Sequence, residues 1–334
     1  MSLAFLAPCA CRAASDPQAL ARFEFEEPGM GTRFRIVLYA PDDRVAASAS
    51  AAAFARLAAL EACLSDYDPD SELSQLSRAS DVAAPTPWIA VSQDLGTVLA
   101  RAREISDASD GAFDVTCGTA TRLWRRAFRE GELPAAEALS LARASIDWRA
   151  VELAQDHGRA RLLLRGMRLD LGGIAKGYAL DEMLLVLESA GVRSALVDGG
   201  GDVAVSAAPP GERGWRIDLG PATVSAPRGP TLVLADAAVA TSGDLERSAE
   251  IGGTRYSHIV DPRTAHGLTE RRGASVVARD GMTADAFATA ATVVGPSASD
   301  GRWRNFGVEL RVVAAGAHGL EIGSSPGFAR LGEP

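Results

Sequence analysis

The sequence predicts an α+β fold, and two observations lead to that prediction. Residues 45–64 and 174–190 carry apolar side chains at helical spacing over long windows, which is typical of helices packed on a core. Between 194 and 260, short runs of alternating apolar and polar residues are separated by Gly, Pro and Asp, as in antiparallel hairpins. Helices and strands do not alternate regularly along the chain, so a parallel βαβ sheet is disfavoured.

The elements of the first half follow from pattern and capping residues. The run FRIVLYA predicts a strand at 34–40, and Phe54, Leu57 and Leu60 recur at helical spacing in the helix at 45–64. A second helix is expected at 92–106, because the Ser92 side chain can accept a hydrogen bond from an amide of the first turn. Two short strands are also expected to pair, at 151–153 and 161–164.

The second half begins with the helix at 174–190, which Gly191 closes. A further helix is expected at 283–294. Strands are expected at 194–197, 215–219, 231–234, 256–260 and 274–278, with a final strand at 308–314. We interpret residues 23–334 as a single domain, with a soft subdomain boundary near 134–144.

Composition limits the classes of function. The chain has 334 residues, of which 47% are hydrophobic and 23% charged, as expected of a soluble globular protein. The formal net charge of −9 disfavours nucleic acid and anionic membrane as partners, since both require a basic surface. An acidic protein that binds a polyanionic small molecule therefore needs a metal ion or local cations.

We interpret residues 1–22 as a truncated secretory leader followed by a flexible N-terminus. The segment MSLAFLAPCACRAA at 1–14 is apolar and ends in small residues, although a basic start is missing. LAPC at 6–9 weakly resembles a lipoprotein acylation box, which would give a lipid anchor. We therefore expect a periplasmic or envelope location, with the cytoplasm as the alternative. No membrane span is expected, since no run of 18 apolar residues occurs elsewhere.

The chain has four cysteines, Cys9, Cys11, Cys63 and Cys117. They form no Cys-x-x-Cys pair, so neither a metal cluster nor a disulfide framework is expected. We interpret Cys63 and Cys117 as buried thiols, and a disulfide between them stays an open alternative.

The most informative segment is DLGGIAKGY at 170–178, which joins a strand to the helix at 174–190. Its two glycines let the backbone approach a ligand closely, and the amides at a helix start attract anions. Lys176 is the single lysine among 34 basic residues, which suggests an ammonium that the broader guanidinium cannot replace. The segment matches neither a Walker A loop nor the GxGxxG motif. The structural alternative is a tight strand-to-helix turn.

Asp285 and Thr289 stand four residues apart in the helix expected at 283–294, so their side-chain oxygens share one face. A carboxylate and a hydroxyl, completed by waters and phosphate oxygens, suit Mg²⁺, which prefers octahedral oxygen ligands. The alternative is that Asp285 only caps the helix or interacts with its dipole.

The segment YSHIVDPRT at 256–264 sets His258 near Asp261, where a strand is expected to end. Of the four histidines, His258 is the one placed among Ser, Asp and Arg side chains, where an imidazole can act as a base. A structural hydrogen-bonding role is the alternative. Taken singly, Met30, Tyr67 and the run at 110–116 would indicate turns or packing.

Taken together, and in their order along the chain, these segments resemble the ApbE family of FAD:protein FMN transferases. The likeness extends over residues 30–295, roughly four fifths of the chain. The matching segments are MGT at 30–32, LSDYDPDSELSQL at 64–76, DGAFDVT at 110–116, DLGGIAKGYALD at 170–181, DGGGD at 198–202, ATSGD at 240–244, SHIVDPRT at 257–264 and ADAFATA at 284–290. No single segment is decisive, whereas the ordered set is specific.

The resemblance implies a T-fold-related architecture of mixed sheets with packed helices and an FAD cleft between two subdomains. By the same likeness, the residues that line the flavin and adenosine ends of FAD are Met30, Tyr67, Ala112, Phe113 and Asp114. The residues that correspond to positions holding the rest of FAD are Asp170, Lys176 and Ile259. The metal site corresponds to the Gly173 carbonyl with Asp285 and Thr289, and the catalytic base to His258.

The reaction that the resemblance implies is Mg²⁺-dependent transfer of FMN from FAD to a Thr or Ser hydroxyl, with release of AMP. His258 would take the hydroxyl proton, while Mg²⁺ and Lys176 withdraw charge from the phosphates. The implied acceptors are flavin-carrying subunits of membrane redox complexes.

Some positions depart from the family pattern. Ala288 stands where some members have a second Asp, so whether a second metal ion binds stays open. Ser77, Leu245 and Ala265 replace an expected Asn, an expected aromatic residue and an expected Gly, respectively. Two other functions fit the same residues, namely a Mg²⁺-dependent FAD pyrophosphatase that uses water and a non-enzymatic FAD-binding carrier. A nicotinamide dehydrogenase is disfavoured, because no GxGxxG follows a strand.

Overall fold

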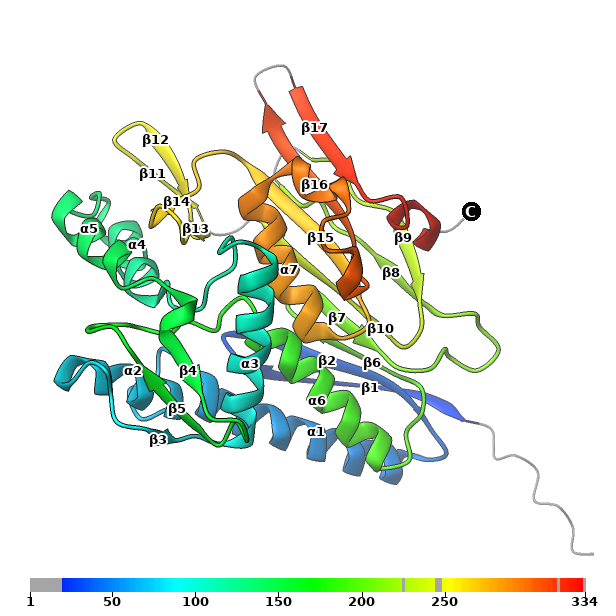
Figure 1. Ribbon diagram of the computed structural model, residues 1–334. Coiled ribbons are helices and arrows are strands. Elements are labelled where there is room, and N and C mark those ends of the chain that lie inside the picture. The colour runs from blue at the N-terminus through cyan, green and yellow to red at the C-terminus, as the bar shows by residue number, and fades with distance from the viewer. Residues whose placement is uncertain (1–19, 224–225, 244–247, 317–318, 333–334) are drawn as a thin grey trace, which may run out of the picture.

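A large antiparallel sheet organises the molecule in the computed structural model, which describes residues 20–223, 226–243, 248–316 and 319–332 (Figure 1). Every pair of neighbouring strands in this sheet is antiparallel. In spatial order the eight strands are β1 (Ala21–Gly29), β2 (Thr32–Ala40), β6 (Ala195–Gly199), β7 (Asp202–Val205), β10 (Ala237–Gly243), β15 (Arg272–Ala278), β16 (Glu309–Gly316) and β17 (Gly319–Ser324).

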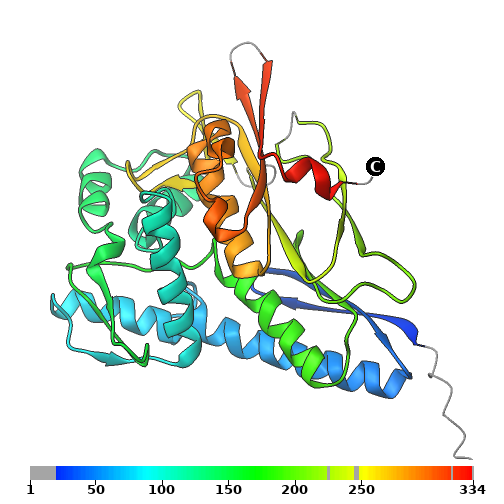
Figure 2. The same ribbon diagram turned by 45° about the vertical axis from the view of Figure 1, so that its right-hand side comes forward.

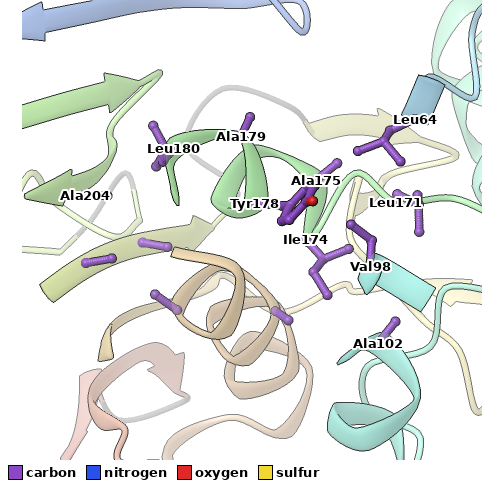
Figure 3. Close-up of a cluster of buried hydrophobic side chains, with 14 of the residues drawn as sticks. Leu64, Val98, Ala102, Leu171, Ile174, Ala175, Tyr178, Ala179, Leu180 and Ala204 are labelled. Carbon is purple, nitrogen blue, oxygen red and sulfur yellow. The ribbon is translucent and has the colours of Figure 1, made fainter. Parts of the chain in front are cut away.

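Three helices cover one face of this sheet, namely α1 (Asp43–Leu64), α6 (Ala175–Ser189) and α7 (Gly281–Val294). α7 contacts β10 and β15, α6 contacts β6 and β7, and α1 packs against α6, β1 and β2. Figure 3 shows the core around the start of α6, where the buried side chains of Ile174, Ala175 and Tyr178 lie among their neighbours. The turn that precedes α6 is therefore anchored by buried residues.

The opposite face of the sheet is covered by a hairpin and a C-terminal turn. β8 (Trp215–Asp218) pairs with β9 (Thr231–Leu234), and η4 (Phe328–Leu331) contacts β9. Side chains alternate across the sheet, so Ile36 and Leu38 of β2 join the core under the helices, whereas Val37 joins the cluster around Trp215. The central strands are thus buried on both faces.

The remaining elements lie beside α1 and α7 (Figure 2). α2 (Glu72–Val82) and α3 (Gln93–Ala108) accompany a small sheet of β3 (Ile89–Ala90), β5 (Arg159–Leu162) and β4 (Val151–Leu153). α4 (Gly118–Glu130) packs on α5 (Ala136–Ala144) and contacts β11 (Ser248–Ile251). The other elements are β12 (Thr254–Ser257), β13 (Val260–Asp261), β14 (His266–Gly267), η1 (Trp148–Ala150), η2 (Pro296–Asp300) and η3 (Arg304–Phe306).

Short polar side chains begin most of the long helices. Ser92 caps α3 by accepting a hydrogen bond from the Leu95 amide at 3.2 Å, as its sequence position predicts. Asp42 and Asp280 do the same for α1 and α7. By contrast, the N-cap residue of α6, Ile174, makes no side-chain capping hydrogen bond, and the Gly177 amide in the first turn donates to Asp285 of α7.

The α+β class is confirmed, and the helices predicted at 45–64, 92–106, 174–190 and 283–294 are present as α1, α3, α6 and α7. The single strand predicted at 256–260 is wrong. The chain bends at His258 and Ile259, so β12 and β13 belong to separate hairpins. The strand at 308–314 is not the last one, because β17 follows it and pairs with β16.

The sequence patterns also missed several elements. β1 begins at Ala21, inside the stretch 1–22 that we interpreted as leader and flexible N-terminus, while residues 1–19 lie outside the described residues. Neither α2 nor α4 was expected, because in each only a narrow stripe is buried and most of the surface is polar or small. Residues 134–144, near which a soft boundary was expected, include α5.

Among the described helices, α1 is long and apolar enough to cross a membrane by length and composition alone. It packs along α6 and the edge of the large sheet, as a core helix of a folded domain does. Cys63 and Cys117 are both free thiols, so the alternative of a disulfide between them is wrong. Both residues are partly exposed and not buried as predicted. Cys9 lies outside the described residues.

Candidate functional site

The glycine turn before α6 is held by Asp170. The carboxylate of this buried residue accepts hydrogen bonds from the Gly172 amide at 2.8 Å, the Thr121 hydroxyl at 2.8 Å and the Arg125 guanidinium at 2.9 Å. Thr121 and Arg125 both belong to α4. The turn is therefore fixed in its own loop and also tied to a second element.

Arg125 connects this turn to Tyr67. Its guanidinium pairs with both Asp170 and Asp66, and it lies 4.3 Å from the centroid of the Tyr67 ring, within cation–π distance. Burial and the nearby Asp170 charge raise the pKa of Asp66. Tyr67 itself is 72% exposed, so its ring is accessible to solvent while Arg125 packs against it and pairs with the two acids.

Gly173 brings two predicted site segments into contact with α7. A Cβ built on Gly173 would lie 2.8 Å from the Thr289 hydroxyl and 3.4 Å from the Phe113 ring, so no larger residue fits without movement. Phe113 and its neighbour Ala112 are buried. Three segments far apart in the sequence therefore meet where the glycine turn enters α6.

Asp114 follows Phe113 and is almost completely buried. Its carboxylate accepts hydrogen bonds from the Thr116 amide at 2.8 Å and the Thr116 hydroxyl at 2.7 Å. Burial nevertheless dominates and raises the pKa of Asp114 to about 6. In this protein Asp114 organises its own turn.

Lys176 lies in the first turn of α6 and forms an ion pair with Asp202, a buried residue of β7. Asp202 is itself oriented by the Thr241 amide, which donates to it at 3.0 Å. Asp285 of α7 accepts a hydrogen bond from the Gly177 amide at 3.1 Å. Burial raises the pKa of Asp285 to about 6, against the opposing effect of the Lys176 charge, and Asp202 raises it further. The Lys176 ammonium thus interacts electrostatically with two buried carboxylates, those of Asp202 and Asp285.

The donors around this point fit a hard cation. Asp285 supplies a carboxylate, and Thr289 supplies a hydroxyl one turn later on α7. Gly173 lies so close to Thr289 that a side chain at position 173 would collide with the Thr289 hydroxyl. Carboxylate, hydroxyl and carbonyl oxygens are the ligands that Mg²⁺ takes. Within the described ranges no group of three or more His, Cys, Asp or Glu side chains could hold a metal ion. A metal site here would therefore rest on mixed oxygen donors.

The other predicted site residues come from separate turns. Met30 occupies the turn between β1 and β2 with a left-handed φ of 47°, beside the glycines that precede Asp202, since a Cβ on Gly200 would meet Thr32 at 2.6 Å. His258 and Ile259 form the bend between β12 and β13, where the Ile259 amide donates to the Ser257 hydroxyl at 3.1 Å. These residues take no part in the contacts around Asp170 or Gly173 described above.

Two surface cavities lie away from this site. One cavity of about 430 Å³ is bordered by Trp124, Leu139 and Tyr256, and another of about 700 Å³ by Tyr178, Asp181 and Met282. None of the predicted FAD or metal residues lines either of them. The contacts between named residues, rather than hollow volume, define the candidate site.

Sequence reasoning missed three residues that the structure brings into this site. Asp66 and Asp202 were only parts of matched segments, LSDYDPDSELSQL and DGGGD, and Arg125 drew no attention. The signal for Asp66 and Asp202 was their position inside those segments. Arg125 gave none, because one arginine on a helix rich in arginine does not stand out.

Comparison with known proteins agrees with this arrangement. A family model described as the ApbE family matches residues 30–310. A protein of Treponema pallidum named FAD:protein FMN transferase is 34% identical over 298 residues, which cover 83% of this chain and 80% of that protein. The solved ApbE protein of Thermotoga maritima has a TM-score of 0.82 at 27% identity and covers 94% of this chain and 100% of that one. The apo flavinyl transferase ApbE of Pseudomonas stutzeri has a TM-score of 0.80 at 25% identity, with 95% and 98% covered.

The fold and these relatives define the class of protein as a transferase. The chain belongs to the ApbE family. One departure from the family pattern now has a structural meaning, because Ala265 has a left-handed φ of 62°, a conformation that favours glycine. Leu245, another departure, lies outside the described residues.

Proposed function

We propose that this protein transfers FMN from FAD to a Thr or Ser hydroxyl of an acceptor protein, with Mg²⁺ as cofactor and AMP as the leaving group. The single observation that carries the proposal is the contact of Gly173 with Thr289. It brings the glycine turn at the start of α6 and Lys176 together with the α7 face that bears Asp285. The compact ammonium attracts phosphate, and the oxygen donors attract the cation that accompanies it.

Each residue of the candidate site has a separate role in this proposal. Asp170 holds the glycine turn that leads into α6, and Lys176 provides a compact positive charge for the pyrophosphate of FAD. Tyr67 offers a face on which an aromatic ring of FAD can stack. Mg²⁺, held by Asp285, Thr289 and the Gly173 carbonyl, would neutralise phosphate charge as it develops.

His258 is proposed as the base of the transfer. The neutral imidazole takes the proton from the acceptor hydroxyl, whose oxygen forms the new bond to the FMN phosphorus. The bond from that phosphorus to the bridging oxygen breaks, and the oxygen leaves with AMP. The same residues would serve hydrolysis if water entered in place of the hydroxyl, so the acceptor decides between the two outcomes.

The protein that receives FMN is proposed to be a flavin-carrying subunit of a membrane redox complex, modified on the periplasmic side. The apolar segment at 1–14 supports export, and a lipid anchor at Cys9 would keep the enzyme at the envelope. Cell fractionation with an antibody to this protein tests the location. Recovery in the cytoplasm alone would remove this part of the proposal.

Mass spectrometry of an acceptor subunit tests the central proposal. The purified subunit is incubated with this protein, FAD and Mg²⁺, and the expected result is a mass increase equal to FMN minus water on one Thr or Ser peptide, with AMP released in equal amount. An acceptor subunit with that residue changed to Ala is the control. Release of FMN and AMP without labelling would favour a pyrophosphatase, and intact FAD after addition of Mg²⁺ would favour a carrier.

A further inference from the structure

The two helices that carry the candidate site cross with their backbones in contact. A Cβ built on Gly177 of α6 would lie 2.1 Å from the carbonyl oxygen of Gly281, the first residue of α7. The converse also holds, since a Cβ on Gly281 would lie 2.5 Å from the carbonyl oxygen of Gly177. Contact this close fixes the distance between the helix axes, but it leaves rotation and sliding of α7 to be set by other groups.

Asp181, one turn after Gly177, supplies such a group. Its carboxylate accepts hydrogen bonds from the Gly281 amide at 2.6 Å and the Met282 amide at 2.9 Å, which are the first two amides of α7. A side chain of α6 therefore caps the start of α7 from outside. Burial raises the pKa of Asp181 to about 7, and the neighbouring carboxylates of Asp280 and Glu182 add to the shift.

Capping alone does not require Asp181. Asp280 already stands at the N-cap position of α7 and accepts a hydrogen bond from the Thr283 amide at 2.7 Å. Both acids are only partly exposed, and both meet the same helix start. What distinguishes them is their origin, because Asp280 belongs to the chain that enters α7, whereas Asp181 belongs to the other helix.

The residues fixed by this connection are those of the candidate site. Gly173 and Lys176 lie at the start of α6, while Asp285 and Thr289 follow the capped end of α7 by one and two turns. The hydrogen bond from the Gly177 amide to Asp285 crosses the same interface. A small slide of α7 would therefore move both predicted metal ligands relative to the glycine turn.

We propose that Asp181 is a positioning residue that sets the register of α7 against α6 and thereby the geometry of the oxygen donors around Gly173. The inference rests on the proposed function, since it concerns the same site. Asp181 touches no predicted ligand residue. It acts through the first amides of α7, much as residues behind a metal ligand orient that ligand.

The test compares Asp181→Asn with Asp280→Ala. Each change removes one carboxylate from the same helix start, and alanine at the N-cap position also removes the cap on the Thr283 amide, so both are expected to lower the melting temperature. Mg²⁺ is titrated into each protein by calorimetry in the absence of FAD, and kcat and KM for FAD are measured with an acceptor subunit. We expect Asp181→Asn to weaken Mg²⁺ binding and lower kcat by about 10- to 100-fold, the usual effect of losing a residue behind a metal ligand. Asp280→Ala should change both by less than about 2-fold even though its melting temperature also falls.

Equal losses of Mg²⁺ binding and kcat in the two variants, or no loss in either, would overturn the proposal. If Asp181 only capped α7, its loss would have the same effect on the site as the loss of the Asp280 cap. If Asp181→Asn does not fold, Asp181→Glu keeps the charge and moves the carboxylate by one methylene. It should fold with a near-normal melting temperature yet show the same weaker Mg²⁺ binding, and normal Mg²⁺ binding in a folded Asp181→Glu overturns the inference. A wild-type protein that binds Mg²⁺ but labels no acceptor would contradict the proposed function and leave this inference standing. A wild-type protein that binds no Mg²⁺ would overturn both.

Discussion

The ion pair between Lys176 and Asp202 connects the composition of the chain to its chemistry. The single lysine points at a buried carboxylate that the Thr241 amide holds in place. A phosphate bound near Lys176 therefore shares the ammonium with a fixed acid. A compact ammonium can contact two acceptors in different directions, whereas a guanidinium presents its donors in one plane.

Lys176→Arg is accordingly expected to lower kcat/KM for FAD by about 10- to 100-fold although the charge is kept, because the wider group displaces the phosphate. AMP release at varied FAD concentration measures this. Arg126→Lys, an exchange at an exposed position of α4, is the matched control and should be silent. Normal turnover by Lys176→Arg would show that the lone lysine has no special role.

His258 lies in the bend between β12 and β13, and its replacement separates catalysis from binding. His258→Asn should reduce FMN transfer by about 10²- to 10⁴-fold, the usual contribution of a general base, while the affinities for FAD and Mg²⁺ are kept. Calorimetry with FAD and acceptor labelling on one preparation give both numbers. Collapse of FAD affinity would instead mark His258 as a binding residue, and unchanged labelling would remove it from the mechanism.

Asp114 predicts a specific dependence of stability on pH. Burial raises its pKa in the folded protein to about 6, above the ordinary value near 3.8, so the folded state holds the proton more tightly than the unfolded state. The stability that Asp114 contributes is therefore fully present below about pH 4 and is lost as the pH rises through 6. Asp114→Asn, which is neutral throughout and keeps an oxygen acceptor, should gain about 2–3 kcal/mol relative to wild type between pH 4 and pH 8. Urea unfolding at both pH values tests this, and a pH-independent difference would contradict it.

At the scale of elements, α4 joins the glycine turn to the segment that carries Tyr67. The helix is mostly polar, and Arg125 is its one residue that pairs with two buried carboxylates, Asp66 and Asp170. Removing the guanidinium would leave both acids without their shared partner. The stability of the site wall and the orientation of the exposed tyrosine therefore depend on one side chain.

Arg125→Met should destabilise the folded protein by about 3 kcal/mol, because buried carboxylates that lose their ion-pair partner are strongly unfavourable. Arg126→Met, a neighbouring change on the exposed side of α4, should cost less than about 0.5 kcal/mol. Free energies of unfolding in urea give the comparison. Similar values for the two variants would mean that Asp66 and Asp170 find other partners, and the connection to Tyr67 would lose its support.

At the scale of the whole molecule, the protein is acidic and its proposed substrate is an anion. With a net charge of −9, long-range electrostatics oppose the approach of FAD, so attraction has to come from local groups. The structure gathers them where α6 and α7 cross on one face of the large sheet (Figure 1). Both helices pack on that sheet, so the geometry of the site depends on the folding of the whole domain.

Binding of Mg²⁺ should therefore stabilise the whole protein. A ligand that binds only the folded state at about 100 times its Kd adds about 2.7 kcal/mol, which appears as a rise of several degrees in the melting temperature. Thermal unfolding with Mg²⁺ and with EDTA measures the rise, and Asp285→Ala should abolish it, while Thr289→Val should only shift it to higher Mg²⁺ because water can replace a neutral ligand. A melting temperature that is unaffected by Mg²⁺ would falsify the proposed metal site.

The sequence by itself determined the fold class, the family and most of the main helices. Periodicity and capping signals depend on residues a few positions apart, so α1, α3, α6 and α7 could be predicted from local patterns. The ordered segments from 30–32 to 284–290 carried the family, because their spacing is a property of the chain. Asp285 and Thr289 lie on one face of α7, as their spacing of four residues predicts, and their role as metal ligands stays a prediction.

Only the tertiary structure decided which distant residues meet. No local pattern shows that Arg125 joins Asp170 to Asp66 or that Lys176 pairs with Asp202. Nor does one show that Asp181 of α6 caps α7, whose first residue lies 100 positions further along the chain. The bend at His258 also follows from the packing of two hairpins and not from their residues, which read as one strand. The cap by Asp181 arises where the large sheet brings α6 and α7 together at Gly177 and Gly281, because only glycine lets the two helix backbones approach so closely.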